Sequence, residues 1–309
     1  MLEINKLSVR FSAQNTVQAV DDVTLSLQDG DKTVIIGETG SGKSVLLLAM
    51  LNLLPKNAIV SGQVLLDKED ILTASKKRLR QIRGGLISYV PQGGGNSMNP
   101  LLTAGFQAGE PLIEHCGYSK RTAVKESIRL FDQLNLGNAR VLARSYPHTF
   151  SGGMRQRVMV AMGMLSGAKI LLADEPTKGL DEKHIRLVAD MFVHFEREAL
   201  LCVTHDLSFA QKISRRICVM YASLQVEMGS TEEIMTCPLH PYTQDMLRAM
   251  PEKGMNSCSI GFAPPNTGYG AENGCRYLPR CACGFERCRK MPPMIHMGSR
   301  SVRCWKYAD

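Results

Sequence analysis

The sequence predicts an α/β domain built on a sheet with parallel strands, followed by a small irregular segment that is rich in cysteine. Strand and helix patterns alternate over residues 32–205, which is typical of a parallel sheet covered by helices on both faces. A glycine-rich loop joins one such strand to one such helix, and five of the ten cysteines lie within residues 275–304. In sheets of this kind, ligands bind beyond the carboxyl ends of the strands.

Length and composition set the broad class. A chain of 309 residues, 44% of them hydrophobic, suits one large globular domain plus an extension. No run approaches the roughly 18 to 20 consecutive apolar residues of a membrane span, and the first residues lack the basic start and apolar core of a signal peptide. We therefore expect a chain that stays in the cytosol and does not itself cross a membrane.

The formal charge of +8 suits nucleotide phosphates, an acidic partner or nucleic acid. The densest basic run, residues 76–80, has none of the interleaved aromatic residues of a nucleic-acid platform. A solvated helix face explains this run better, and we expect no nucleic-acid partner.

The elements follow in order along the chain. Alternating apolar and polar residues predict two antiparallel strands, and short apolar runs predict buried strands between helices. The expected strands are 2–11, 16–27, 33–36, 86–90, 169–173 and 199–204, and the expected helical segments are 45–54, 101–150 and 181–197. After about residue 250 the sequence has no helix or strand period, which predicts an irregular segment.

The glycine-rich loop has the pattern Gly-x-x-x-x-Gly-Lys-Ser. Between a strand and a helix, such a loop turns several backbone amides toward one point, where the helix N-terminus adds partial positive charge. Its residues are Gly37, Glu38, Thr39, Gly40, Ser41, Gly42, Lys43 and Ser44. We expect Lys43 to reach the β- and γ-phosphates of ATP and Ser44 to bind Mg²⁺. The alternative is a glycine-rich turn that ends in Lys-Ser by chance.

Two further strand ends carry polar residues. Asp174 and Glu175 follow the apolar run 170–173, and His205 follows the run 199–204. Hydrolysis of ATP needs a metal ligand and a base for the attacking water, so we expect Asp174 to bind Mg²⁺ and Glu175 to be the base. His205 has the chemistry to contact the γ-phosphate and steady Glu175, although a lone histidine is more often structural. Because all these residues follow strand ends, the sequence predicts one shared site.

A second anion-binding pattern, Ser151, Gly152 and Gly153, lies between the phosphate loop and Asp174 at the expected start of a helix. The order of phosphate loop, Gln92, Ser-Gly-Gly, Asp-Glu, Asp181 and His205 resembles the ATP-binding subunits of ABC transporters. The resemblance covers nearly all of residues 1–250. It implies a P-loop ATPase domain of the ABC type, with a mixed sheet and a helical subdomain at about 95–165, and a separate C-terminal domain at 251–309.

The resemblance also implies roles by position. Phe11 is similar to the aromatic residue that stacks on adenine, although it could equally be a core strand residue. Gln92 resembles the glutamine that senses Mg²⁺ and contacts the membrane subunit. Ser151, Gly152 and Gly153 resemble the signature loop, which contacts the nucleotide on the opposite subunit, so that two ATP molecules lie between two subunits. Asp181 resembles the aspartate that couples the two sites.

The departures from the family pattern are small. The signature begins with Phe150 and has Met154 at its end, and Lys178 precedes Gly179, Leu180 and Asp181. Lys178 places additional positive charge near the expected dimer interface. This charge argues against a homodimer, because like charges would face each other there.

The C-terminal segment carries a second resemblance. His240-Pro241-Tyr242-Thr243 and the run Gly274-Cys275-Arg276-Tyr277-Leu278-Pro279-Arg280-Cys281 resemble the C-terminal region of the oligopeptide, dipeptide and nickel branch of ABC importers. The resemblance implies a different ATPase subunit as partner, two membrane permease subunits, an extracellular substrate-binding protein, and a position on the cytoplasmic face of the membrane. Its cargo would be peptides, nickel or metal–chelator complexes.

The cysteine cluster suggests a metal. Cys275, Cys281, Cys288 and Cys304 have the spacing C-x₅-C-x₆-C-x₁₅-C. Four thiolates bind Zn²⁺ or a [4Fe–4S] cluster, and the absence of a short C-x₂₋₄-C pair from this set of four favours the iron–sulfur cluster slightly. Cys283 could replace Cys281, and the alternative is a loop of free thiols.

Two other functions stay open: an ABC ATPase that acts on DNA or ribosomes, and a metal or redox sensor in which the ATPase is regulatory.

Overall fold

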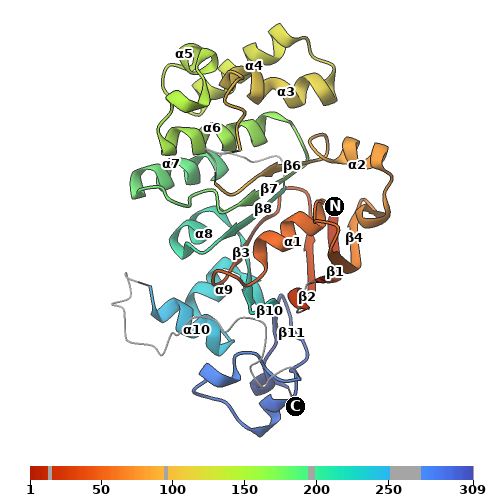
Figure 1. Ribbon diagram of the computed structural model, residues 1–309. Helices are drawn as coiled ribbons and strands as arrows, with labels where there is room; N and C mark the ends of the chain where they lie inside the picture. Colours follow the sequence, from red (N-terminus) through yellow and green to blue (C-terminus); the bar gives the residue numbers. More distant parts are fainter. Residues whose placement is uncertain (13–15, 94–96, 194–198, 251–272, 309) are drawn as a thin grey trace. The chain divides into compact units, whose positions relative to one another are not determined.

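The computed structural model describes residues 1–12, 16–93, 97–193, 199–250 and 273–308. Contacts divide the chain into two compact units. The first unit consists of residues 1–27, 32–72 and 205–309, and the second of residues 28–31 and 73–204. Both are α/β units, and each is described separately below (Figure 1).

The first unit contains a mixed sheet in which the strands β5-β4-β1-β2-β10-β9-β3 are neighbours in that order. β1 pairs with β2 and β4 in antiparallel register, whereas β3 pairs with β9 in parallel register. Their bounds are β1 (Leu2–Phe11), β2 (Val17–Leu27), β3 (Lys32–Ile36), β4 (Ala58–Leu66), β5 (Glu69–Asp70), β9 (Arg216–Tyr221) and β10 (Leu224–Ser230). Alternation in β1 places Leu2 and Ile4 in the core, and a register shift between Ile4 and Leu7 places Leu7 there as well.

Helices and a 3₁₀ turn complete this unit. Their bounds are α1 (Lys43–Met50), the 3₁₀ turn Ile71–Thr73, α8 (Leu207–Ile213), α9 (Thr231–Thr236) and α10 (Pro241–Arg248). The turn ends one residue beyond the unit. α1 packs on β1 and β2, and α8 packs beside β3. The antiparallel strands 2–11 and 16–27 are therefore confirmed, and the predicted helix 45–54 starts earlier and ends earlier.

The C-terminal segment is less irregular than predicted. Two short strands, β11 (Ile295–Met297) and β12 (Arg300–Val302), pair with each other, and β12 also pairs with β10. Three 3₁₀ turns, Leu278–Arg280, Glu286–Arg289 and Trp305–Tyr307, accompany them. The prediction of no strand after residue 250 was wrong because three-residue strands are too short to show a period of two. Residues 251–272, which include Cys258, lie outside the described residues.

The second unit has the parallel strands β6-β7-β8, as the alternation of strands and helices predicted. Every side chain of β7 and β8 is buried, as expected for a parallel sheet. Its bounds are β6 (Ile87–Val90), β7 (Ile170–Asp174), β8 (Ala199–Thr204), α2 (Lys76–Ile82), α6 (Gly152–Leu165) and α7 (Glu182–Val193). The basic run 76–80 lies on α2 with three of its five residues exposed, as a solvated helix face predicts.

Residues 101–150 are mostly helical, as expected. The helices α3, α4 and α5 pack on one another, and α3 and α4 also pack on α6 (Figure 1). Their bounds are α3 (Ala104–Cys116), α4 (Lys120–Gln133) and α5 (Ala139–Arg144), followed by the 3₁₀ turn Pro147–Thr149. Close packing requires glycine at two points, since a Cβ on Gly105 would lie 2.7 Å from Cβ of Ala143 and one on Gly109 would lie 2.9 Å from Ala123.

No helix in the described part of the chain is long and apolar enough to cross a membrane.

Candidate nucleotide site and cysteine pocket

The phosphate loop lies between β3 and α1 in the first unit. Two of its glycines cannot be replaced without movement of the backbone around them. A Cβ on Gly37 would lie 2.1 Å from the carbonyl oxygen of Met220, and one on Gly42 would lie 2.0 Å from that of Ala19. Gly42 also has φ +96, a conformation that favours glycine. The loop therefore passes against the backbones of β9 and β2, which fixes its path.

Lys43 is buried in this loop. Its Nζ donates hydrogen bonds to the carbonyl oxygens of Gly37 at 2.7 Å and Glu38 at 2.9 Å. The residue at the N-cap of α1 is Gly42, which has no side chain to cap the helix, and Thr39 and Gly40 at the tip are exposed. Backbone amides at an N-terminus of this kind form an anion site, and the adjacent ammonium adds a full positive charge.

Two other predicted residues belong to the same unit. Phe11 ends β1 opposite Val17 and Ala58 and is half-buried, which leaves both its predicted roles open. His205 directly follows β8 and is exposed, and the next residue, Asp206, caps α8 by accepting a hydrogen bond from the amide of Phe209 at 2.9 Å.

The acidic pair lies in the second unit, at the carboxyl end of β7. Asp174 is 2% exposed and Glu175 is 7% exposed. Glu175 has φ +47, a left-handed conformation that is strained for a residue with a Cβ. Its amide nitrogen donates to the carbonyl oxygen of Val203 on β8 at 2.9 Å, which holds this bend in place.

Tyr89, which was not among the predicted site residues, contacts Asp174 of this pair. Its hydroxyl donates to Oδ2 of Asp174 at 3.3 Å from the neighbouring strand β6. Burial raises the pKa of Tyr89, and the nearby charge of Asp174 raises it further. Burial likewise raises the pKa of Cys202, with added effect from Glu175 and Asp174. The parallel pairing of strands 86–90 and 169–173 was the only signal that could have suggested the Tyr89 contact.

The Ser-Gly-Gly pattern starts α6, as predicted. Ser151 is the N-cap, and its Oγ accepts a hydrogen bond from the amide of Met154 at 3.3 Å. Ser151 and Gly152 are exposed, and a Cβ on Gly152 would meet nothing within 4 Å. The N-terminus of α6 is therefore exposed, as an anion-binding role would require.

A contact with α7 was also missed. Asp181 precedes α7, and its Oδ1 accepts from the amide of His184 at 2.9 Å and lies 2.7 Å from Nδ1 of that residue. These hydrogen bonds from His184 lower the pKa of Asp181. A Cβ on Gly153 would lie 2.7 Å from the His184 ring. His184 thus links Asp181 to the Ser-Gly-Gly loop within this unit.

Gln92 follows β6, is exposed, and precedes Gly93 at φ +88. The predicted residues therefore fall into two groups. The phosphate loop, Phe11 and His205 belong to the first unit, and the other predicted nucleotide residues, Gln92, Ser151, Gly152, Gly153, Asp174, Glu175 and Asp181, belong to the second. The prediction of one shared site stays a prediction.

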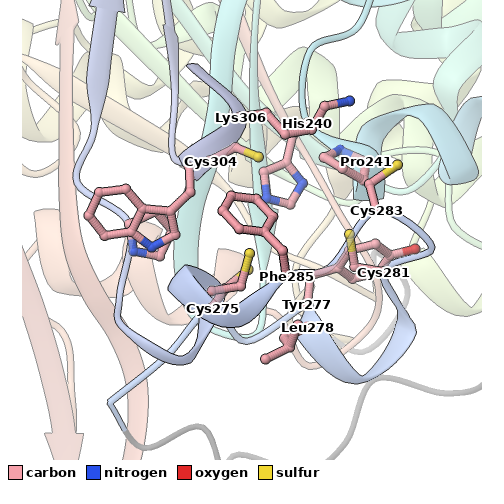
Figure 2. A pocket seen from close by; sticks show the side chains of 13 residues that line it. His240, Pro241, Cys275, Tyr277, Leu278, Cys281, Cys283, Phe285, Cys304 and Lys306 are labelled. Atoms are coloured by element: carbon pink, nitrogen blue, oxygen red, sulfur yellow. The ribbon is translucent and has the colours of Figure 1, made fainter. Parts of the chain in front are cut away.

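The cysteines of the C-terminal segment surround a pocket in the first unit (Figure 2). Cys288 and Cys304 are buried and Cys283 is exposed. Figure 2 shows the ring of Phe285 between the thiol of Cys304 above and that of Cys275 below, with Cys281 and Cys283 toward the right of the view. The pocket is lined by Cys275, Cys281, Cys283, Cys288 and Cys304, with His240, Tyr277 and Phe285 among the other lining residues.

The thiols suit a thiolate-bound metal in number and chemistry, but the distances between them in the structure do not suit one. Burial raises the pKa of Cys275 to about 11 and also raises the pKa values of Cys281 and Cys304. As free thiols they are therefore protonated at neutral pH, and a metal would have to displace those protons. Within the described residues, no three His, Cys, Asp or Glu side chains lie close enough together to hold a metal ion.

Comparison with known proteins finds two families that match separate stretches of this chain. The family described as "ABC transporter" matches residues 20–178, and the family "Oligopeptide/dipeptide transporter, C-terminal region" matches residues 226–288. The oligopeptide transport ATP-binding protein OppD of Salmonella typhimurium is 36% identical over 99% of this chain and 93% of its own length.

The chain belongs to the ATP-binding subunits of ABC transporters. It carries the C-terminal region of the oligopeptide/dipeptide branch, and it is an ATPase with the P-loop fold of this family. The dipeptide transport ATP-binding protein DppD of Bacillus subtilis is 34% identical over 99% of this chain and 94% of its own length. A solved dimeric ATP-binding cassette in a post-hydrolysis state, with ADP and phosphate bound, has a TM-score of 0.65 and 26% identity over 75% of this chain and 99% of its own.

Proposed function

We propose that this ABC ATPase is the motor subunit of a peptide importer. The observation that carries the proposal is the phosphate loop: Lys43 is buried against the carbonyls of Gly37 and Glu38 at the uncapped start of α1. The relatives named for oligopeptide and dipeptide transport, which match over nearly the whole chain, support peptides as the cargo. Nickel and metal–chelator complexes have no such support.

Hydrolysis of ATP requires the protein chiefly to position the reacting groups and to stabilise charge. The loop amides and Lys43 would hold the phosphates of ATP, and Phe11 would stack on adenine. Ser44, Asp174 and Gln92 offer a hydroxyl, a carboxylate and an amide oxygen, which are donors that suit Mg²⁺. When bound, Mg²⁺ neutralises charge that develops on the phosphate oxygens.

Glu175 would accept a proton from the attacking water, and His205 would contact the γ-phosphate. The left-handed backbone of Glu175, held by Val203, fixes the direction of its side chain. A fixed orientation of the base matters in this reaction, because the protein stabilises the loose transition state by position and charge and not by forming covalent bonds.

A second ATPase subunit completes the motor in this proposal. The exposed N-terminus of α6 at Ser151 can bind an anion presented by another chain, and the dimeric solved cassette supports pairing. Lys178, three residues before Asp181, is exposed, which favours a different partner subunit over a second copy. Two membrane permeases and an extracellular binding protein would complete the importer, with this chain at the cytoplasmic face of the membrane.

The motor is tested by hydrolysis with and without the partner. The chain alone is expected to bind ATP and release little phosphate, whereas the chain with its companion ATPase subunit and Mg²⁺ hydrolyses it. Lys43→Ala should abolish both signals. Failure of the wild-type chain to bind ATP in the presence of Mg²⁺ would refute the proposal.

For the cysteine pocket, we propose a [4Fe–4S] cluster bound by Cys275, Cys281, Cys288 and Cys304, with Zn²⁺ as the alternative. These thiols line one pocket, which supports a shared ligand, but they would have to move closer together to bind it. The role would be to stabilise the segment after residue 273, which has few core residues of its own.

Metal analysis of anaerobically purified chain decides between these assignments. Iron with sulfide and a visible absorption band supports the cluster, and zinc without colour supports the alternative. Neither metal would leave free thiols. Cys288→Ser should lower the metal content, and Cys116→Ser, on α3, is the control.

A further inference from the structure

The C-terminal segment contacts the phosphate loop within the first unit. The guanidinium of Arg280 forms a two-pronged ion pair with the carboxylate of Glu38, the second residue of the loop. Nη1 lies 3.2 Å from Oε1 and 3.3 Å from Oε2, and Nη2 lies 3.2 Å from Oε1. The side chain of Arg280 is only 10% exposed and that of Glu38 is 24% exposed, so water screens this pair less than a surface pair.

Each polar group of Glu38 has a partner. Its amide nitrogen donates to the hydroxyl of Tyr242 at 3.0 Å, and its carbonyl oxygen accepts from Nζ of Lys43 at 2.9 Å. Its carboxylate binds Arg280. Glu38 therefore connects the lysine that we assign to the phosphates with two residues of the segment after β10.

Arg280 is itself held firmly. It lies at the end of the 3₁₀ turn Leu278–Arg280, and its guanidinium stands 5.7 Å and 5.5 Å from the ring centres of Tyr221 and Tyr277. The rings of Tyr221 and Tyr242 lie 4.5 Å apart, and Tyr277 meets both of them edge-on or nearly so. This packing leaves the arginine fork few alternative positions, and a planar fork matches a carboxylate in two places.

The negative charge of Glu38 makes its contact with Arg280 important for binding a nucleotide. A carboxylate in a loop that binds a triphosphate repels the ligand, and the repulsion is strong where water is partly excluded. Arg280 neutralises that carboxylate and holds it on the side of the loop that faces Tyr221 and Tyr277. Loss of Arg280 would leave Glu38 charged, unpaired and free to turn toward the phosphates.

We propose that Arg280 is a positioning residue of the ATP site, which acts through Glu38 to hold the phosphate loop in its binding shape and to cancel a charge that opposes the nucleotide. The inference rests on the proposed function of the loop. It makes the C-terminal segment a part of the ATP site of its own chain, in addition to any metal that it binds.

The experiment is a double-variant cycle on ATP affinity. Mg·ATP binding by the full chain is measured by calorimetry for the wild type, Arg280→Ala, Glu38→Gln and the combined variant. Arg280→Ala should weaken binding about tenfold, as expected for loss of one partner from a partly buried ion pair. The combined variant should regain most of that loss, because the charge that Arg280 neutralised is gone.

Two further variants separate positioning from general stability. Arg276→Ala is the matched control: it lies on the same stretch between Cys275 and Cys281 but pairs with Asp21 on β2 and not with a residue of the loop. It should bind ATP as the wild type does. Arg280→Lys keeps the charge but not the fork, so its affinity should fall between those of the wild type and Arg280→Ala.

The outcomes are distinct. Wild-type ATP affinity in Arg280→Ala would overturn the inference. An equal loss of affinity in Arg280→Ala and in the combined variant would also overturn it, because Arg280 would then have a purely structural role. Melting temperatures of each variant are recorded to show that it is folded. Failure of the wild type to bind ATP would refute the proposed function of the loop instead.

Discussion

Nδ1 of His184 lies 2.7 Å from Oδ1 of Asp181, and the same ring fills the space beside Gly153. One side chain thus contacts both the aspartate before α7 and the glycine-rich start of α6. In the proposed motor, both segments belong to the surface that meets the partner's nucleotide. His184 is therefore placed to hold them in register.

His184→Ala is expected to lower ATP hydrolysis by the assembled pair about fivefold, the effect of losing one net hydrogen bond of about 1 kcal/mol. ATP binding to the isolated chain should be unchanged. Phosphate release assays measure the first and calorimetry the second. His296→Ala, an exposed histidine on β11, is the control, and equal hydrolysis by both variants would contradict a role for His184.

Glycine at position 42 should be required for steric reasons beyond its backbone angle. Gly42→Ala places a Cβ 2.0 Å from the carbonyl oxygen of Ala19, so we expect loss of ATP binding and a lower melting temperature. Gly30→Ala is the matched control, because Gly30 also has positive φ, +76, but a Cβ there would meet nothing within 4 Å. The control should lose only about 1 kcal/mol of stability and keep full affinity. Similar behaviour of the two variants would show that the approach to Ala19 is unimportant.

The sequence predicted the parts of this molecule that local patterns encode. The strand 199–204 has the predicted bounds, and Ser151 starts α6 as expected, because an apolar run and a capping serine are local signals. The contact between Arg280 and Glu38 joins residues 242 positions apart, and no local pattern encodes such a pair. The same holds for Tyr89 and Asp174, which meet only through the pairing of β6 with β7.

Buried His240 should make the chain less stable below about pH 6.5. Burial lowers the pKa of His240 to about 3, whereas an unfolded histidine has a pKa of about 6.5. Between these values the unfolded chain binds a proton that the folded chain does not. Above about pH 6.5 this group therefore does not change the free energy of unfolding. Below that pH the free energy of unfolding falls by up to about 1.4 kcal/mol per pH unit as the pH decreases toward 3.

The test compares the wild type with His240→Asn in urea unfolding at pH 7.5 and pH 5.5. Nδ1 of His240 caps α10 by accepting from the amide of Tyr242 at 3.1 Å, and asparagine caps helices well without titrating in this range. On going to pH 5.5, the wild type should lose about 1 kcal/mol more than the variant. Equal losses would show that His240 is protonated in the folded chain.

Glu175 should be the residue whose neutralisation stops the motor after ATP binding. Glu175→Gln keeps the size and the hydrogen bond of its amide nitrogen to Val203 but removes the base. With its partner subunit, the variant is expected to bind ATP, to lose multiple-turnover hydrolysis by at least about a hundredfold, and to stay in a closed dimer. Size-exclusion chromatography in Mg·ATP would show the dimer, and phosphate assays the loss of turnover. Glu182→Gln, an exposed glutamate in the first turn of α7, is the control and should hydrolyse ATP normally. Repeated turnover by Glu175→Gln at the wild-type rate would remove Glu175 from the role of base and leave Asp174, His205 or bound water to supply it.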